Sequence, residues 1–177
     1  MKVRRVVTGH TPDGKSVIAS DTEVDAITSP MAPEMEFHRL WGANKAPTFP
    51  DDGSPHPNPA YFPPIGGFRF ILFSVPPDSI TPPENLDIKA ELLEIEAKLP
   101  GMLSYLESDN SGMHTTDTID FEYVLSGEVW LELDDGVEVH LRPGDTVVQN
   151  GTRHAWRNKG SEVCRMVGFL IGAHRRG

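Results

Sequence analysis

HTTDTIDFEYVLSG at residues 114–127 and PGDTVVQNGTRHAWRN at residues 143–158 are the two stretches that decide the fold. Each alternates polar with apolar residues over a short span and contains glycine, which is typical of short β-strands joined by tight turns. Side chains at even separation along a strand face the same way. Each stretch therefore places histidine or carboxylate side chains on one face of a strand.

The chain around these two stretches reads as strand and turn from Met102 onward. Leu131 and Leu133 alternate with polar neighbours, residues 134–136 (DDG) form a hairpin turn, and a second alternating strand follows at residues 137–142. We expect Val139 to face the core and His140 to face outward. Several short strands at even spacing predict a sandwich or a closed barrel.

The part of the chain before residue 102 adds strands, a loop and one helix. β-type runs at residues 3–7 and 16–20 form an N-terminal strand extension, and further strands are expected at 35–41 and 68–75. Helical spacing of Ile88, Leu92, Ile95 and Leu99 predicts a peripheral helix over residues 85–99, capped by Asn85 and packed by this apolar stripe.

The long connection at residues 46–67 carries seven prolines, at positions 47, 50, 55, 57, 59, 63 and 64. Proline lacks a backbone donor, so the stretch is neither a central strand nor a helix. Its aromatic residues, Phe49, Tyr61 and Phe62, indicate that part of the loop packs down. We weigh two interpretations: a surface crossing, or a cover over the mouth of a pocket.

Composition limits the class of protein. A chain of 177 residues is long enough for one domain, and its net charge of −10 argues against nucleic-acid binding. The single cysteine, Cys164, favours a reducing compartment. No window approaches the roughly 20 apolar residues that span a bilayer, and no secretory signal is apparent. We expect a cytoplasmic protein with no membrane partner.

The two deciding stretches resemble the two sequence motifs of the cupin superfamily, over residues 102–171. Those motifs contribute three histidines and one glutamate to a metal in the mouth of a small β-barrel. Aligned on Gly127, the first motif places His114 and Asp120 at a histidine and the glutamate position, with Thr116 in place of the second histidine. In the second motif His154 and Asn158 match, whereas Asn150 stands where the motif has proline.

The resemblance implies an all-β, cupin-type jelly-roll β-barrel with one peripheral α-helix and the N-terminal strand extension. It is a single domain, in which residues 1–101 complete the barrel and residues 102–177 carry the core motifs. Proteins of this type often pair through the outer sheet or through exchanged N-terminal strands. We therefore expect a homodimer, with Trp130 as a candidate contact.

The resemblance and strand parity together give a candidate site. His114, Asp120 and His154 are the expected metal ligands, and two histidines with one carboxylate suit Fe, or Mn, Ni or Zn. Glu122 shares the inward face with Asp120, so both are candidate catalytic carboxylates. Two carboxyls in one pocket do not both ionise cheaply, so one pKa is expected to rise. The expected substrate pocket comprises Thr116, Glu122, Trp156 and Asn158.

Two functions of different class remain open. The first is an enzyme that uses a divalent transition metal on a small oxygenated organic molecule, as a dioxygenase, decarboxylase, lyase or isomerase. The second is a metal-free cupin that binds a small-molecule ligand without catalysis. If no metal binds, the carboxylates and histidines still suit acid–base chemistry. Fold resemblance alone does not choose between them.

Overall fold

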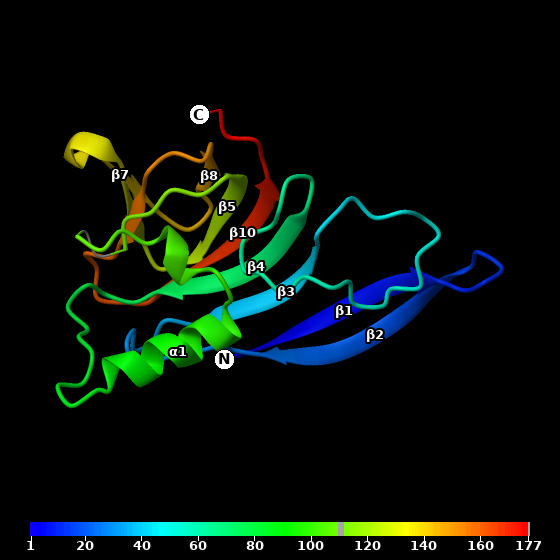
Figure 1. Cartoon of the computed structure of the whole chain (residues 1–177), viewed down its shortest axis with the longest axis horizontal. Coiled ribbons are helices and arrows are strands. Elements are labelled where there is room, and N and C mark those ends of the chain that lie inside the picture. Colours follow the sequence, from blue (N-terminus) through cyan, green and yellow to red (C-terminus); the bar gives the residue numbers. More distant parts are fainter. Residues whose placement is uncertain (110–111, 177) are drawn as a thin grey trace.

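The computed structural model describes residues 1–109 and 112–176, and within them the chain is all-β with one α-helix, as predicted (Figure 1). The strands are β1 (Lys2–His10), β2 (Ser16–Asp25), β3 (Phe37–Ala43), β4 (Phe68–Val75), β5 (Thr118–Ser126), β6 (Val129–Glu132), β7 (Glu138–Leu141), β8 (Thr146–Gln149), β9 (Ala155–Arg157) and β10 (Cys164–Gly172). The helix is α1 (Ile88–Lys98), and short 3₁₀ turns lie at Leu103–Tyr105 and Asp134–Gly136. None of the described helices is long and apolar enough to cross a membrane.

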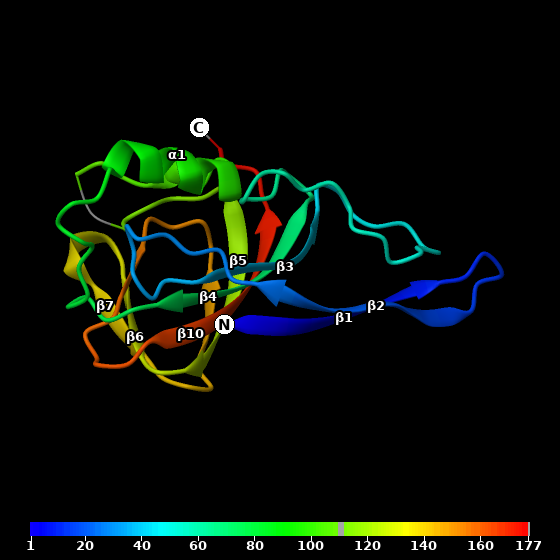
Figure 2. The same ribbon diagram turned by 90° about the horizontal axis from the view of Figure 1, so that it is seen from below.

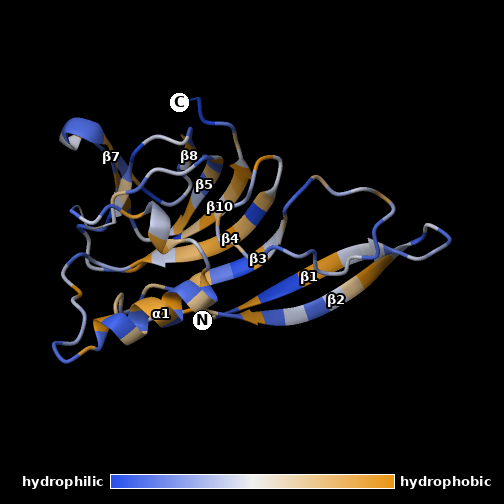
Figure 3. Cartoon of the chain, in the orientation of Figure 1, coloured by the Kyte–Doolittle hydropathy of each residue, from blue (hydrophilic) through white to orange (hydrophobic). Residues whose placement is uncertain are grey.

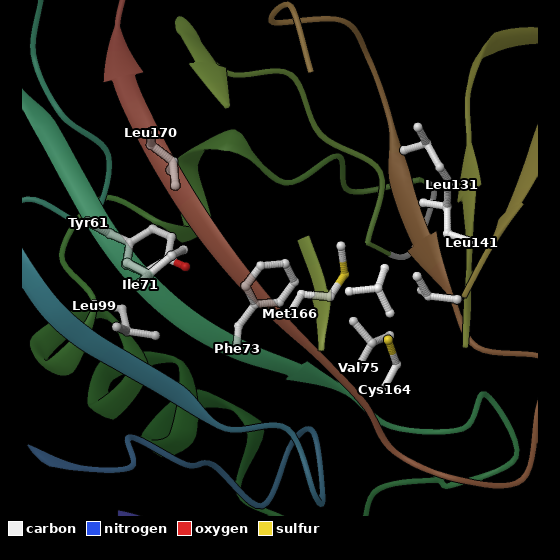
Figure 4. Close-up of a cluster of buried hydrophobic side chains, with 12 residues drawn as sticks. Tyr61, Ile71, Phe73, Val75, Leu99, Leu131, Leu141, Cys164, Met166 and Leu170 are labelled. Atoms are coloured by element: carbon white, nitrogen blue, oxygen red, sulfur yellow. The ribbon is translucent and has the colours of Figure 1, made fainter. Parts of the chain in front are cut away.

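Two antiparallel sheets form the body of the molecule. The larger has the order β3-β4-β10-β5-β8, and the smaller has the order β7-β6-β9. Hydrophobic residues concentrate on β4 and β10, in the middle of the larger sheet (Figure 3). Their inward side chains form one buried cluster with Leu131 and Leu141 from the smaller sheet (Figure 4). The two sheets therefore face each other across a shared core.

The N-terminal strand extension is a separate two-stranded hairpin, β1-β2, that projects from the body (Figure 2). Both strands are longer than the expected runs at 3–7 and 16–20. The proline-rich loop packs along the hairpin, because His10 donates its backbone N–H to the carbonyl of Asp51 at 2.7 Å. A Cβ on Gly9 would lie 2.2 Å from the carbonyl oxygen of Asp52, so this close approach requires glycine.

The helix departs from its prediction in both its start and its packing. It begins at Ile88, and the side chain of Asp87, not that of Asn85, accepts the backbone N–H of Ala90 at 3.1 Å. The expected apolar stripe does not hold it to the sheet, because no residue within the helix is buried. Leu99, directly after the helix, is 2% exposed and anchors this segment to the core.

Two further expectations about burial are corrected. Val139 is exposed and does not face the core, because β7 is the edge strand of the smaller sheet. His140 lies outside the pocket as expected, stacked on Trp130 with 4.1 Å between ring centroids. In the proline-rich loop Tyr61 and Phe62 pack against the core, whereas Phe49 is 71% exposed.

Candidate functional site

Strand β5 turns its polar side chains inward, as strand parity predicted. Asp120 and Glu122 are 4% and 7% exposed, whereas Phe121 and Tyr123 between and beyond them point outward and are exposed. The pairing of β5 with β10 places Glu122 opposite Gly168. A Cβ on Gly168 would lie 3.1 Å from Cγ1 of Ile71, so the side chain of Ile71 packs closely over this glycine.

His114 and His154 meet across an isolated backbone bridge. Each donates its N–H to the carbonyl of the other at 2.9 Å. Their ring centroids lie 4.2 Å apart, with the rings inclined at 48°. The convergence of the two imidazoles, predicted from residues far apart in the chain, is therefore present in the structure.

Both imidazoles are oriented by backbone carbonyls. Nδ1 of His114 lies 2.9 Å from the carbonyl of Gly112, and Nδ1 of His154 lies 2.9 Å from the carbonyl of Thr152. A carbonyl only accepts, so Nδ1 of each ring carries the proton and donates it. Each Nε2 is then a free acceptor.

Burial controls the charge of the site. It lowers the pKa of His114, and burial followed by the neighbouring His114 lowers the pKa of His154 to about 4. Burial raises the pKa of Asp120 to about 6, although a hydrogen bond from Thr118 acts in the opposite direction. Burial and then the charge of Asp120 raise the pKa of Glu122 well above its usual value. The imidazoles are therefore neutral at neutral pH, and the protonated form of Glu122 is favoured by its burial and by the charge of Asp120.

These four side chains line one pocket of about 230 Å³ between the two sheets. Most of its wall is apolar, and the residues that complete it are Met35, Phe37, Tyr61, Phe62, Ile71, Phe73, Val75, Met102, Leu106, Gly112, Trp156 and Leu170. Pockets for drug-sized ligands occupy about 300–1,000 Å³. This pocket therefore suits a more compact molecule.

Sequence reasoning assigned Trp156 to the pocket but missed Tyr61 as a lining residue. Trp156 lines it and also packs against Phe73, with 6.5 Å between ring centroids. Burial, and then the carboxyls of Glu122 and Asp120, raise the pKa of Tyr61. The aromatic pair at 61 and 62 in a proline-rich loop was the available signal, because it indicated that this end of the loop packs down.

Two residues expected in the pocket do not line it. Thr116 is fully buried behind the site, where its hydroxyl lies 2.8 Å from that of Thr118. Asn158 is also fully buried, and its amide donates to the carbonyls of Val75 and Glu162. Its hydrogen bonds join the strand ends, so it supports the fold and leaves no amide group for a ligand.

The expected metal ligands come together only in part. The two imidazoles leave both Nε2 atoms free, which suits metal binding. Among residues 1–109 and 112–176, however, no three His, Cys, Asp or Glu side chains are placed to hold one ion. Asp120 shares the pocket but does not join the histidines as a third ligand. The arrangement of the described residues does not fit the expected three-ligand set.

Comparison with known proteins identifies the domain and several relatives. Residues 103–170 match the model of the cupin domain. A phomopsin biosynthesis cluster protein C′ of Diaporthe leptostromiformis is 51% identical over 47 residues, which is 27% of this chain and 25% of that protein. A cupin-domain-containing oxidoreductase, fogC, of Aspergillus ruber is 24% identical over 96% of this chain and 72% of its own length.

A solved structure also has some similarity to this chain. The cupin domain of Schizosaccharomyces pombe Cnp3 is 9% identical, with a TM-score of 0.49, over 96% of this chain and 87% of that one. The match to the first of the curated relatives spans only a quarter of that relative's length.

Proposed function

The chain belongs to the cupin superfamily, and we propose that it is an enzyme that moves protons within a compact, oxygen-bearing organic molecule. In this proposal the molecule occupies the pocket between the two sheets. Asp120 and Glu122 act as base and acid, and His114 and His154 orient the substrate. Isomerase and lyase reactions are the classes that such proton transfers serve.

The observation that carries this proposal is a pair of buried carboxyl oxygens without partners. Oδ1 of Asp120 and Oε2 of Glu122 are inaccessible to solvent and have no hydrogen-bond partner among the described residues. A buried polar group without a hydrogen bond costs about 1–3 kcal/mol. Because both residues line the pocket, a bound molecule that offers O–H groups or a carbonyl would satisfy them.

The charge states assign the two roles. Burial favours the protonated form of Glu122, and in that form the carboxyl is a donor that suits a carbonyl oxygen gaining negative charge during the reaction. Asp120, with a pKa of about 6, is largely ionised at neutral pH and suits removal of a proton from the neighbouring carbon. The free Nε2 atoms of the two histidines would accept hydrogen bonds from a hydroxyl group at the other end of the substrate.

The relatives support a small organic substrate. The names of the Diaporthe relatives place those proteins in a biosynthesis cluster, and the name of the Aspergillus ruber relative describes an oxidoreductase. The apolar wall, with Phe37, Phe73 and Trp156, matches a flat or cyclic carbon skeleton.

Hydrogen exchange on a panel of enolisable aryl ketones tests the proposal. In D₂O the wild-type protein should accelerate incorporation of deuterium next to the carbonyl. Asp120→Asn should abolish the acceleration, and Glu122→Gln should reduce it about 100-fold, within the usual range for one acid or base. Tyr123→Phe, on the same strand but facing outward, is the matched control and should behave as wild type. If Asp120→Asn and the wild type exchange deuterium at the same rate, Asp120 is not the base.

A second candidate is the metal-dependent enzyme that the cupin motifs imply. One observation favours it: carbonyls hold Nδ1 of His114 and His154 and leave both Nε2 atoms free. A Fe, Mn, Ni or Zn ion bound there would supply a Lewis acid and, for iron, redox chemistry. Elemental analysis distinguishes the candidates. Stoichiometric metal that is lost in His154→Ala would support the second, and metal-free protein that still catalyses exchange would support the first.

We further propose that the protein is a cytoplasmic homodimer that pairs through the outer face of the larger sheet. This face exposes a row of apolar side chains, namely Phe70, Phe121, Tyr123, Leu125, Val148 and Phe169. A contiguous exposed apolar face on a soluble domain marks an interaction surface. The buried free thiol of Cys164 suits a reducing compartment.

A further inference from the structure

Another pocket, of about 190 Å³, is lined by residues of β1, β3, β4 and the proline-rich loop. Three arginines contribute to its lining: Arg5 from β1, Arg39 from β3 and Arg69 from β4. His56 and Asn58 of the loop complete the polar part of the wall, and none of the described residues that line it carries a carboxylate. The pocket therefore gathers positive charge within a chain whose net charge is −10.

Neutral groups hold these arginines in place. Nη1 of Arg5 donates to the carbonyl of Leu40 at 3.0 Å, and Arg39 donates to Asn58 and to the carbonyls of Pro59 and Ala60. Arg69 uses all five of its N–H groups, on backbone carbonyls and the side-chain oxygen of Asn44. These bonds satisfy donors, but they do not neutralise charge.

No salt bridge compensates the three guanidiniums within residues 1–109 and 112–176. Asp51, within the proline-rich loop, pairs with His56 at 3.2 Å and with none of the three arginines. Burial lowers the pKa of Arg39, and burial followed by the charge of Arg39 lowers the pKa of Arg69 to about 10. The site thus concentrates positive charge that the protein itself leaves unpaired.

Arg5 differs from the other two because it keeps a buried donor free. Its Nε is inaccessible to solvent and has no hydrogen-bond partner in the part of the chain that the structure describes. Its guanidinium lies over the indole of Trp41, 5.5 Å from the ring centroid, and this contact helps to fix its position. A fixed guanidinium with a free edge is the group that binds carboxylate and phosphate through two parallel hydrogen bonds.

We propose that this pocket binds an oxyanion, the phosphate or carboxylate group of a small molecule, with Arg5 as the principal ligand and Arg39 beside it. The fixed field of Arg69 adds to the attraction without direct contact. The anion supplies both the partner for Nε of Arg5 and the negative charge that the described side chains do not provide. The site does not depend on the chemistry of Asp120 and Glu122.

Calorimetric titration of the full chain with inorganic phosphate, and separately with succinate, tests this proposal at constant ionic strength. Wild type should bind at least one of the two anions saturably. Arg5→Gln should weaken anion binding at least tenfold. Arg5→Lys keeps the charge but loses the paired N–H donors of the guanidinium, so its affinity should lie between those of the wild type and Arg5→Gln. Arg4→Gln is the matched control, because Arg4 is the next residue on β1, is 71% exposed and pairs with Asp21.

Each outcome decides the matter once circular dichroism shows that the variants are folded. Binding that is kept in Arg4→Gln and lost in Arg5→Gln supports the site, and the preferred anion identifies the ligand group as phosphate or carboxylate. Absence of saturable binding of either anion to wild type overturns the proposal. So does equal weakening in the two variants, which would show only the overall loss of positive charge.

Discussion

His114 and His154 exchange both of their backbone hydrogen bonds, so the main chain and not the side chains brings the two imidazoles together. Either ring can therefore be replaced without removing the bridge. Each imidazole can therefore be tested by mutation while the backbone bridge stays intact.

The pairing of the rings predicts a coupled titration. His154 should remain neutral down to about pH 4, because burial and His114 lower its pKa. In His114→Ala the second of these causes disappears, and the pKa of His154 should rise while burial still holds it below its usual value. Titration of the imidazole by NMR measures both. An unchanged pKa in the variant would contradict the electrostatic part of this account.

Asp120→Asn should stabilise the protein at neutral pH. Burial raises the pKa of Asp120 to about 6, so between about pH 4 and 6 the native state binds more protons than the unfolded chain. The stability of the wild type therefore falls as pH rises through this window, whereas the neutral amide avoids this loss. Urea unfolding should show a gain of up to about 3 kcal/mol at pH 7, shrinking as pH approaches 4. If the free energy of unfolding rises by the same amount at every pH, the raised pKa of Asp120 is not the cause.

The apolar outer face predicts a change in oligomeric state. Phe121→Asp places a charge in the centre of that face and should convert a dimer into a monomer. Leu93→Asp, on the exposed surface of α1, introduces the same charge at an apolar residue that is 66% exposed. Light scattering measures the mass of both variants. A monomeric wild type, or a dimer that survives Phe121→Asp, would show that the face pairs with something else.

Two glycines of β10 should lose different amounts of stability when replaced by alanine. A Cβ on Gly172 would lie 1.9 Å from the carbonyl oxygen of Pro64, and backbone does not move aside easily. Gly172→Ala should lower the free energy of unfolding by about 1–3 kcal/mol or more. In Gly168→Ala the nearest atoms are side-chain atoms of Ile71 and Leu170, at 3.1 and 3.3 Å, so the loss should be smaller. Chemical denaturation of the two variants compares them directly.

Much of the fold could be predicted because strand parity is a local property. The inward direction of Asp120 and Glu122 followed from alternation alone, and β5 and β8 confirm it. The start of the helix was harder to predict, since Asn85 and Asp87 are both residue types that cap helices, and the structure uses Asp87. Exposure of Val139 depends on strand order, which alternation does not reveal.

Which residues line the pocket was harder to predict than which side chains of a strand point inward. Thr116 and Asn158 have the expected parity, but neither lines the pocket. The hydroxyl of Thr116 is hydrogen-bonded to that of Thr118, and the amide of Asn158 donates to the carbonyls of Val75 and Glu162. Tyr61 reaches the pocket through a loop whose path no periodicity encodes. The arginine pocket was invisible for the same reason, because its members come from three strands separated by long stretches of chain.

The proline-rich loop touches three different parts of the molecule. Its residues near Asp52 pack on the hairpin, its carbonyls at 58–60 hold Arg39, and Tyr61 and Phe62 close the wall of the barrel pocket. A change of length or sequence there would reshape the pocket wall, while Asp120 and Glu122, the proposed acid and base, stay on an unaltered strand. Related chains that differ only in this loop would therefore differ in which molecules their pockets admit.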